Sequence, residues 1–378
     1  MKIGIMTFWN AEDNYGQILQ CYALQKYLIN LGHDAYLIKY DRHGESQKKM
    51  IQGGFKLKYL NIIKIIKIII LKIKIYLAKR KNKMRKFHEF KEKYIKQTDI
   101  TYLYKDLKLK PPDADAYIVG SDQVWNFSND ELQNARSNLH AFFLDFGKNN
   151  IQRLSYAASF CSKVLPKEFI NEITPLLQRF NYVSVREQEG LEICRQCSIS
   201  NAELVIDPTF LLKAEEYRSL YLNENVKIPN RPYILLYILG YSINTKVIKN
   251  IIKYAKLLNL QIIYITGHYR FDKYYRYYYY ATIPEWLGLI DNAEIVITNS
   301  FHGCAFSLIF NKKFAVIPFN KKLEDQNSRF NSLSELFQYK INYITENNYD
   351  IISKLDIPNV SFDLFKNNFN KILSESDK

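Results

Sequence analysis

The chain has 378 residues, of which 47% are hydrophobic, and its formal net charge at pH 7 is +15. This length predicts roughly two to three domains, and the apolar fraction is sufficient for a buried core, which excludes a wholly disordered chain. The low counts of 13 glycines and 10 prolines exclude a collagen-like chain, and the positive charge favours an anionic partner: nucleic acid, acidic lipid headgroups or a phosphorylated substrate.

Five cysteines are too few to build a disulfide framework. The Cys194–Cys197 pair has CxxC spacing, but it has no second pair and no nearby histidine, so we expect a structural helix position and no metal site. No signal pattern precedes the first strand-like run, which favours a reducing, cytoplasmic compartment.

Apolar runs of strand length alternate with helical patterns along the chain. Residues 2–8 predict a strand, the spacing from Ile18 to Leu31 predicts a helix that ends before Gly32, and residues 34–40 predict the next strand. This βαβ order implies a parallel sheet. Further strands are predicted at 116–120, 154–158, 182–185, 204–206, 232–238, 261–265, 294–298 and 314–317, with helices at 245–258 and 303–310.

The alternation restarts after a polar stretch near residues 221–231, so the economical architecture is two α/β halves. We predict an N-terminal α/β domain over residues 1–222, with a basic amphipathic helical insertion at about 55–95. A C-terminal α/β domain follows over 223–345, and a helical tail over 346–378. Ligands of such sheets bind beyond the carboxyl ends of the strands, so residues at strand ends are the candidates for a site.

Residues 56–86 interrupt the alternation with a run rich in isoleucine and lysine. Wound as a helix, the run has an apolar stripe through Ile62, Ile66 and Ile73, and lysines spread over the other side. The lysines are too frequent for a membrane-spanning helix. Two interpretations stay open: a helix lying on an anionic membrane surface, or a helix packing its stripe on the sheet. Nucleic acid ranks behind both, because no base-stacking aromatics accompany the lysines.

The turn Asn299–Gly303 lies directly between a predicted strand and an apolar helix. Such a turn aims backbone N–H groups and the positive end of the helix at an anion. His302 in this turn suits a general acid or an anion ligand, and the alternative is a histidine that merely caps the helix.

Three other strand ends carry polar residues. Val119–Asn126 offers a hydroxyl, a carboxylate and an aromatic face, or simply a helix cap and a core tryptophan. Arg186 suits a carboxylate or phosphate, or else a salt bridge with Glu187. Asp207–Pro208 is more typical of a turn than of a catalyst. Asp13–Gly16 suits an anion or a sugar, and it matches neither a dinucleotide-binding fingerprint nor a Walker sequence.

With these motifs in hand, the sequence resembles the polysaccharide pyruvyl transferase family. Six stretches carry the resemblance and follow one another in family order: Asn14–Gln25, Asp115–Asn126, Ser155–Ser159, Val183–Glu187, Val205–Thr209 and Thr298–Gly303. One departure is Cys161, which stands where the family commonly has glycine.

The resemblance implies two Rossmann-like doubly wound domains that face a cleft, as in GT-B proteins. It also implies transfer of the enolpyruvyl group of phosphoenolpyruvate onto two sugar hydroxyls, which gives a pyruvate ketal and free phosphate. The family's functional histidine and arginine map onto His302 and Arg186, and Asp122 is our candidate for the base. The substrate-binding residues that we expect are Asn14, Tyr15, Gly16, Gln20, Ser121, Gln123, Trp125, Ser300, Phe301, Gly303 and Arg329.

The expected partners are phosphoenolpyruvate, a sugar acceptor of a bacterial surface polysaccharide that is typically lipid-linked, and an anionic membrane reached through residues 56–80. We therefore expect a peripheral protein at the inner face of the plasma membrane, with no cofactor. Two alternatives are a GT-B-type nucleotide-sugar glycosyltransferase and a non-catalytic module that binds lipid-linked glycan at the membrane surface.

Overall fold

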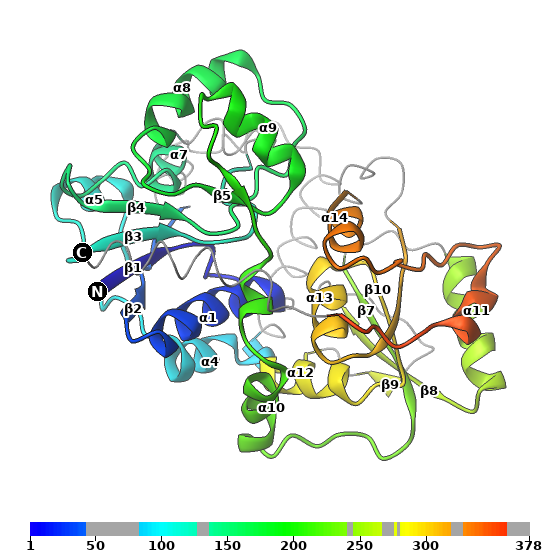
Figure 1. Cartoon of the computed structure of the whole chain (residues 1–378). Helices are drawn as coiled ribbons and strands as arrows, with labels where there is room; N and C mark the ends of the chain where they lie inside the picture. Colours follow the sequence, from blue (N-terminus) through cyan, green and yellow to red (C-terminus); the bar gives the residue numbers. More distant parts are fainter. Residues whose placement is uncertain are drawn as a thin grey trace, which may run out of the picture.

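A computed structural model describes residues 1–42, 83–126, 136–239, 245–266, 276–277, 280–318 and 328–360. Its two parallel sheets occupy the two lobes of Figure 1, one coloured blue to green and the other yellow-green to orange. The first sheet has the order β2-β1-β3-β4, and its strands are β1 (Lys2–Met6), β2 (Asp34–Leu37), β3 (Ala116–Val119) and β4 (Gln152–Ser155). The short parallel pair β5 (Ser184–Val185) and β6 (Glu203–Leu204) continues beyond β4 through isolated bridges.

The second sheet has the order β11-β10-β7-β8-β9, and every pairing in it is parallel. Its strands are β7 (Tyr233–Ile238), β8 (Gln261–Thr266), β9 (Arg276–Tyr277), β10 (Ile295–Thr298) and β11 (Lys313–Val316). The inner strands consist almost wholly of buried apolar residues, as expected where helices cover both faces of a parallel sheet.

The helices begin with α1 (Tyr15–Asn30), which Asn14 caps by accepting a hydrogen bond from the Gln17 amide. In the first lobe the others are η2 (Lys83–Arg85), α4 (Phe87–Tyr94), α5 (Tyr104–Leu109), α7 (Arg136–Phe142), α8 (Lys167–Leu177), α9 (Gln188–Gln196), η3 (Pro208–Leu211) and α10 (Ala214–Asn223). In the second lobe they are α11 (Thr245–Leu257), α12 (Ile283–Asp291), α13 (Phe301–Ile309), α14 (Ser328–Leu336) and η5 (Tyr349–Lys354).

Each sheet reverses its strand order at one place. In the first lobe the chain runs from β1 outward to β2 and then returns to place β3 on the other side of β1. In the second lobe β8 and β9 lie on one side of β7, and β10 lies on the other. Loops diverge at these points, so the ends of β1 and β3, and of β7 and β10, are where a ligand is expected to bind.

The two lobes share one apolar core along α1. Tyr15 is fully buried, stacks on Trp286 of α12 with ring centroids 5.2 Å apart, and donates a hydrogen bond to the Ala281 carbonyl at 2.7 Å. Helix α1 also contacts α13 and η3. These contacts hold the carboxyl ends of the two sheets at a fixed separation.

The predicted strands all appear, with ends that shift by at most three residues. The predicted boundary at residue 222 lies between the two sheets, although α10 packs against α12 across it, so the boundary itself stays a prediction. Residues 349–354 form a 3-10 helix against α11, whereas 361–378 lie outside the described residues, as do 56–80. Cys194 lies in α9 and Cys197 caps it, both buried, which confirms the structural interpretation of the CxxC pair.

Within the described ranges, no helix is both long and apolar enough to cross a lipid bilayer.

Candidate functional site

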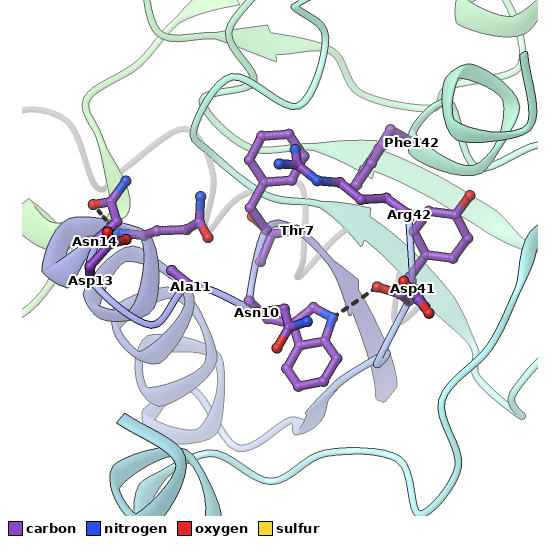
Figure 2. Close-up of a pocket in the computed structure, with 12 residues that line it drawn as sticks. Thr7, Asn10, Ala11, Asp13, Asn14, Asp41, Arg42 and Phe142 are labelled. Carbon is purple, nitrogen blue, oxygen red and sulfur yellow. Dashed lines mark hydrogen bonds between the residues drawn. The ribbon is translucent and has the colours of Figure 1, made fainter. Parts of the chain in front are cut away.

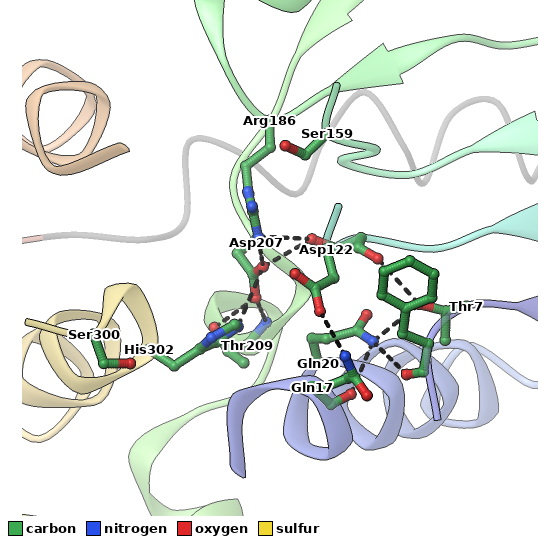
Figure 3. Close-up of polar contacts among 12 residues, drawn as sticks. Thr7, Gln17, Gln20, Asp122, Ser159, Arg186, Asp207, Thr209, Ser300 and His302 are labelled. Atoms are coloured by element: carbon green, nitrogen blue, oxygen red, sulfur yellow. Dashed lines mark hydrogen bonds and ion pairs between the residues drawn. The ribbon is translucent and has the colours of Figure 1, made fainter. Parts of the chain in front are cut away.

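The turn between β10 and α13 is fixed by its own side chains. Asn299 bridges to the end of β7: its amide nitrogen donates to the Leu239 carbonyl at 2.8 Å, and its oxygen accepts from the Leu239 amide at 2.7 Å. Ser300 caps α13 by accepting from the Gly303 amide. Gly303 needs its missing side chain, because a Cβ there would lie 2.4 Å from Thr298 Oγ1. The turn therefore presents His302 toward the other lobe in one orientation (Figure 3).

The His302 ring packs directly against Gly16, near the start of α1. A Cβ at position 16 would lie 2.0 Å from both Cγ and Nδ1 of the imidazole. Real Cβ atoms do not approach so closely, so glycine is required at this position for His302 to occupy its place. The Asn14–Gly16 and Ser300–Gly303 motifs, which the sequence analysis treated separately, are thus in direct contact between the two lobes.

A cluster of buried charges lies beside His302. Arg186, which follows β5, donates from Nη1 to Asp207 Oδ2 at 3.1 Å and from Nε to Glu187 Oε1 at 3.0 Å. Ser121, which follows β3, donates to the same Asp207 oxygen at 2.8 Å. His302 Nε2 lies 3.7 Å from that oxygen, a close contact that is too long for a hydrogen bond. Figure 3 shows Arg186 and His302 approaching Asp207 from two different elements.

The electrostatics of the cluster keep Asp207 and Arg186 charged. Burial by itself raises the pKa of Asp207, but the neighbouring imidazole of His302 and the charge of Arg186 outweigh it and hold this pKa well below its usual range. Burial likewise lowers the pKa of Arg186, but the charges of Glu187, Asp207 and Asp122 outweigh it and raise this pKa further. Asp207 is therefore a carboxylate over the physiological range, placed to orient His302.

Two buried nitrogens in this cluster point to a ligand. Among the described residues, Arg186 Nη2 and His302 Nε2 have no hydrogen-bond partner. Burial, followed by the positive charge of Arg186, lowers the pKa of Arg329 on α14, so the two guanidinium groups repel one another. A buried guanidinium with an unused donor, such as Nη2 of Arg186, is stabilised when an anion binds beside it. The arrangement can therefore hold a small multivalent anion at the N-terminus of α13.

Asp122 lies on the first-lobe side of the cluster. It adopts a left-handed backbone conformation, with φ of +72°, and its Oδ2 accepts a hydrogen bond from Gln17 Nε2 at 3.3 Å. Its carbonyl accepts from the Ser159 amide at 3.1 Å, which ties it to the β4 end. The carboxylate is thus held close to Arg186 and at the rim of the β1–β3 switch point.

Other predicted substrate residues have different surroundings. Trp125 is fully buried, stacks on Phe143 and donates to the Phe142 carbonyl, contacts that fit the alternative interpretation of this motif as a core tryptophan. Tyr15 likewise belongs to the shared core. Gln123 accepts a hydrogen bond from Asn126 Nδ2 at 3.0 Å. These three side chains contact the core and the loop, and their role in substrate binding stays a prediction.

The remaining predicted residues border the cluster. Phe301 lies under Arg186, with the guanidinium 4.7 Å from the ring centroid. Gln20 is buried and donates to Thr7 Oγ1 at 2.9 Å, leaving its Oε1 without a partner among the described residues. Asn14 acts as the α1 cap. The family position at Cys161 has φ of +50°, a left-handed conformation that explains why glycine is common there.

Sequence reasoning did not select Asp207, Glu187 or Gln17 as site residues. Asp207 was interpreted as a turn, and it does cap η3 through Thr209. It also pairs with Arg186, which the turn pattern does not reveal. The sequence did contain a signal for this pair: Arg186 follows one predicted strand and Asp207, of opposite charge, follows the next.

Substitution of Gly16 by alanine is expected to lower turnover about a hundredfold, because the new Cβ displaces the His302 ring by an ångström or more. Overpacking should also cost about 1–3 kcal/mol of stability. The measurements are steady-state kinetics and urea unfolding. In the His302→Ala background the ring is gone, so there Gly16→Ala should cost little stability. An equal cost in both backgrounds would contradict the contact.

Known proteins resemble this chain both in sequence and in fold. A sequence model of the polysaccharide pyruvyl transferase family matches residues 14–320. The comparison with curated proteins gave no match. UDP-GlcNAc 2-epimerase from Methanocaldococcus jannaschii is similar with a TM-score of 0.53 and 14% sequence identity, over 99% of this chain and 100% of that chain. UDP-N-acetylglucosamine 2-epimerase from Rickettsia bellii is similar with a TM-score of 0.49 and 12% sequence identity, over 100% of this chain and 97% of that chain. At such low identity the likeness concerns the fold, and with the two parallel sheets it confirms the predicted GT-B-like architecture.

Proposed function

Because the chain belongs to the polysaccharide pyruvyl transferase family and is therefore a transferase of polysaccharide biosynthesis, we propose that its donor is phosphoenolpyruvate. The acceptor is a sugar of a bacterial surface polysaccharide precursor, and the product is a pyruvate ketal on two of its hydroxyls, with release of phosphate. The family match over residues 14–320 carries the reaction class. The convergence of Arg186, Arg329 and His302 supports an anionic donor.

Phosphoenolpyruvate carries a carboxylate and a phosphate, so it requires two sets of donors. The unused Nη2 of Arg186, with Arg329 nearby, suits one anionic group through charge-assisted hydrogen bonds. The N-terminus of α13, which Ser300 opens, suits the other. This arrangement leaves the reacting carbon beside His302.

The reaction begins when a proton is added to the methylene carbon, which makes C2 oxocarbenium-like. One sugar hydroxyl forms a C–O bond to C2 and loses its proton. The C2–O bond to phosphate then breaks, and a second hydroxyl closes the ketal as it loses its own proton. The protons balance: the two sugar hydroxyls lose two protons, the new methyl group gains one, and the released phosphate gains the other.

Three side chains have roles in this scheme. His302 gives the proton to the methylene carbon, and the neighbouring Asp207 carboxylate orients the imidazole. Asp122, held by Gln17, accepts the proton of the attacking hydroxyl. We propose no metal or other cofactor for these steps.

We propose that the acceptor is lipid-linked and that the lysine-rich segment 56–80, which lies outside the described residues, binds the protein to anionic membrane at the inner face of the plasma membrane. Deletion of residues 56–80 is expected to abolish pelleting with vesicles that contain anionic lipid. It should leave phosphate release with a water-soluble acceptor unchanged. Pelleting that survives the deletion would overturn the membrane role.

The test of the donor is phosphate release from phosphoenolpyruvate, with and without lipid-linked acceptors that end in galactose, glucose or mannose. Release that depends on one acceptor supports the proposal. No release with any acceptor, together with transfer from a UDP- or GDP-sugar, would favour the glycosyltransferase alternative. Vesicle binding without turnover on any acceptor would favour the non-catalytic module.

A further inference from the structure

A cavity of about 270 Å³ opens where β1 and β2 end, outside the charge cluster. Figure 2 shows Asp13 and Asn14 on one side of it, and Asp41, Arg42 and Phe142 on the other, with Asn10 between. Its volume is slightly below the roughly 300–1,000 Å³ of pockets for drug-sized ligands. The cavity therefore suits a ligand of about the size of one monosaccharide.

The aromatic walls of the cavity are held in place before any ligand binds. Trp9 donates from its indole nitrogen to the Tyr40 carbonyl at 3.0 Å. Phe8 packs edge to face on Phe142 with centroids 5.1 Å apart, and the Arg42 guanidinium lies 4.5 Å from the centre of the Phe8 ring. A rigid aromatic surface next to polar groups suits a ligand with C–H faces and hydroxyl edges.

The polar lining excludes a strongly anionic ligand. Two carboxylates, Asp13 and Asp41, line the cavity with one guanidinium, that of Arg42, and the amides of Asn10 and Asn14 add neutral polar groups. Carboxylates accept hydrogen bonds from hydroxyls, amides both donate and accept, and a phosphate would meet repulsion from the carboxylates. A neutral ligand that carries several hydroxyls matches this set.

The cavity shares a wall with the charge cluster. Gln17 lines the cavity and donates to Asp122 Oδ2 at 3.3 Å. Thr7 also lines it and donates to the Ser121 carbonyl at 3.0 Å. A molecule bound in the cavity therefore has one edge directed toward Asp122, the candidate base.

We propose that this cavity binds the acceptor sugar, with Asn10, Asp41 and Arg42 selecting among hydroxyl configurations and Trp9 forming an aromatic wall. This inference rests on the proposed function, because a sugar bound here is an acceptor only if the protein transfers a group to it. It separates two binding places: a neutral sugar between the ends of β1 and β2, and the anionic donor between Arg186 and α13. The hydroxyls that react are those at the edge nearest Gln17.

The test is saturation-transfer NMR of methyl glycosides of galactose, glucose and mannose on the full chain without phosphoenolpyruvate. We expect at least one glycoside to bind the wild type. Asp41→Asn and Asn10→Ala should each weaken it about five- to tenfold, the effect of one lost hydrogen bond. Glu89→Gln is the matched control, because Glu89 is an exposed carboxylate on α4 that lines a different cavity, and it should leave binding unchanged.

Kinetics with an acceptor complete the experiment. The two cavity variants should raise KM for the acceptor by the same factor and leave KM for phosphoenolpyruvate unchanged. Glycoside binding that needs Asp41, without any use of phosphoenolpyruvate, supports the cavity and contradicts pyruvyl transfer. Acceptor-dependent phosphate release that is indifferent to Asp41 and Asn10 overturns the cavity and supports pyruvyl transfer. Absence of glycoside binding to the wild type also overturns it.

Discussion

Replacement of His302 by alanine is expected to lower turnover by about a hundred- to ten-thousand-fold, the usual contribution of a positioned general acid. The structure gives the reason: the ring is buried against Gly16, and its Nε2 faces Asp207 without a hydrogen-bond partner among the described residues. As the proposed proton donor, the imidazole is held in this orientation beside the Asp207 carboxylate. The measurement is the rate of phosphate release at saturating donor and acceptor.

A second histidine provides the control for this variant. His88 is exposed on α4, and its Nε2 lies 3.1 Å from Glu92 at the surface. His88→Ala should therefore leave turnover within a factor of two of the wild type by the same assay, an order-of-magnitude expectation for a surface substitution. Near-normal turnover in His302→Ala, with an unchanged unfolding midpoint, would remove His302 from the mechanism.

Replacement of Arg186 by alanine is expected to lower the free energy of unfolding by about 3–5 kcal/mol, the cost of breaking a buried ion pair from one side. Asp207 and Glu187 would both lose their countercharge in a place where water does not reach them. The measurement is urea unfolding at neutral pH. Turnover should fall as well, because the same guanidinium is proposed to bind the donor.

Arg195 offers a matched arginine for comparison. It pairs with Glu192 one turn away on α9, and both side chains are more than half exposed. Exposed pairs contribute at most about 1 kcal/mol, so Arg195→Ala should change stability by no more than that. Equal losses in the two variants would contradict the view that the buried cluster organises the site.

The pH dependence of stability tests the interaction of Asp207 with Arg186 independently. The folded state holds the pKa of Asp207 below its unfolded value of about 3.9, so this group stabilises the fold above that pH. The contribution is lost as pH falls from about 4 toward the lowered pKa. Arg186 is part of what lowers this pKa, so Arg186→Ala should show a shallower loss of stability over this acid range.

The sheets were predictable because their strands are continuous apolar runs bounded by polar or small residues. Residues 233–238 and 295–298 are examples in which every position is buried. The strand order, with its two switch points, was not readable from these runs, since pairing depends on contacts between distant segments. The motif at 299–303 was selected correctly as a strand-end turn because a polar stretch directly joins a strand and an apolar helix.

The site was only partly predictable for the same physical reason. The contact of Gly16 with His302 joins two lobes, and nothing in the local pattern at either end indicates it. Asp207 appeared to be a turn residue, and its second role depends on where Arg186 lies after folding. Trp125 and Tyr15 were predicted as substrate-binding residues because they belong to motifs; both are fully buried in the core, which no local pattern indicated.

The most direct test of pyruvyl transfer uses phosphoenolpyruvate labelled with carbon-13 at C2, with the acceptor that supports phosphate release. We predict that the label appears in a quaternary ketal carbon attached to the sugar, with one phosphate released for each ketal formed. A label that remains in phosphoenolpyruvate, or appears only as free pyruvate while the sugar is unchanged, would contradict pyruvyl transfer by this protein.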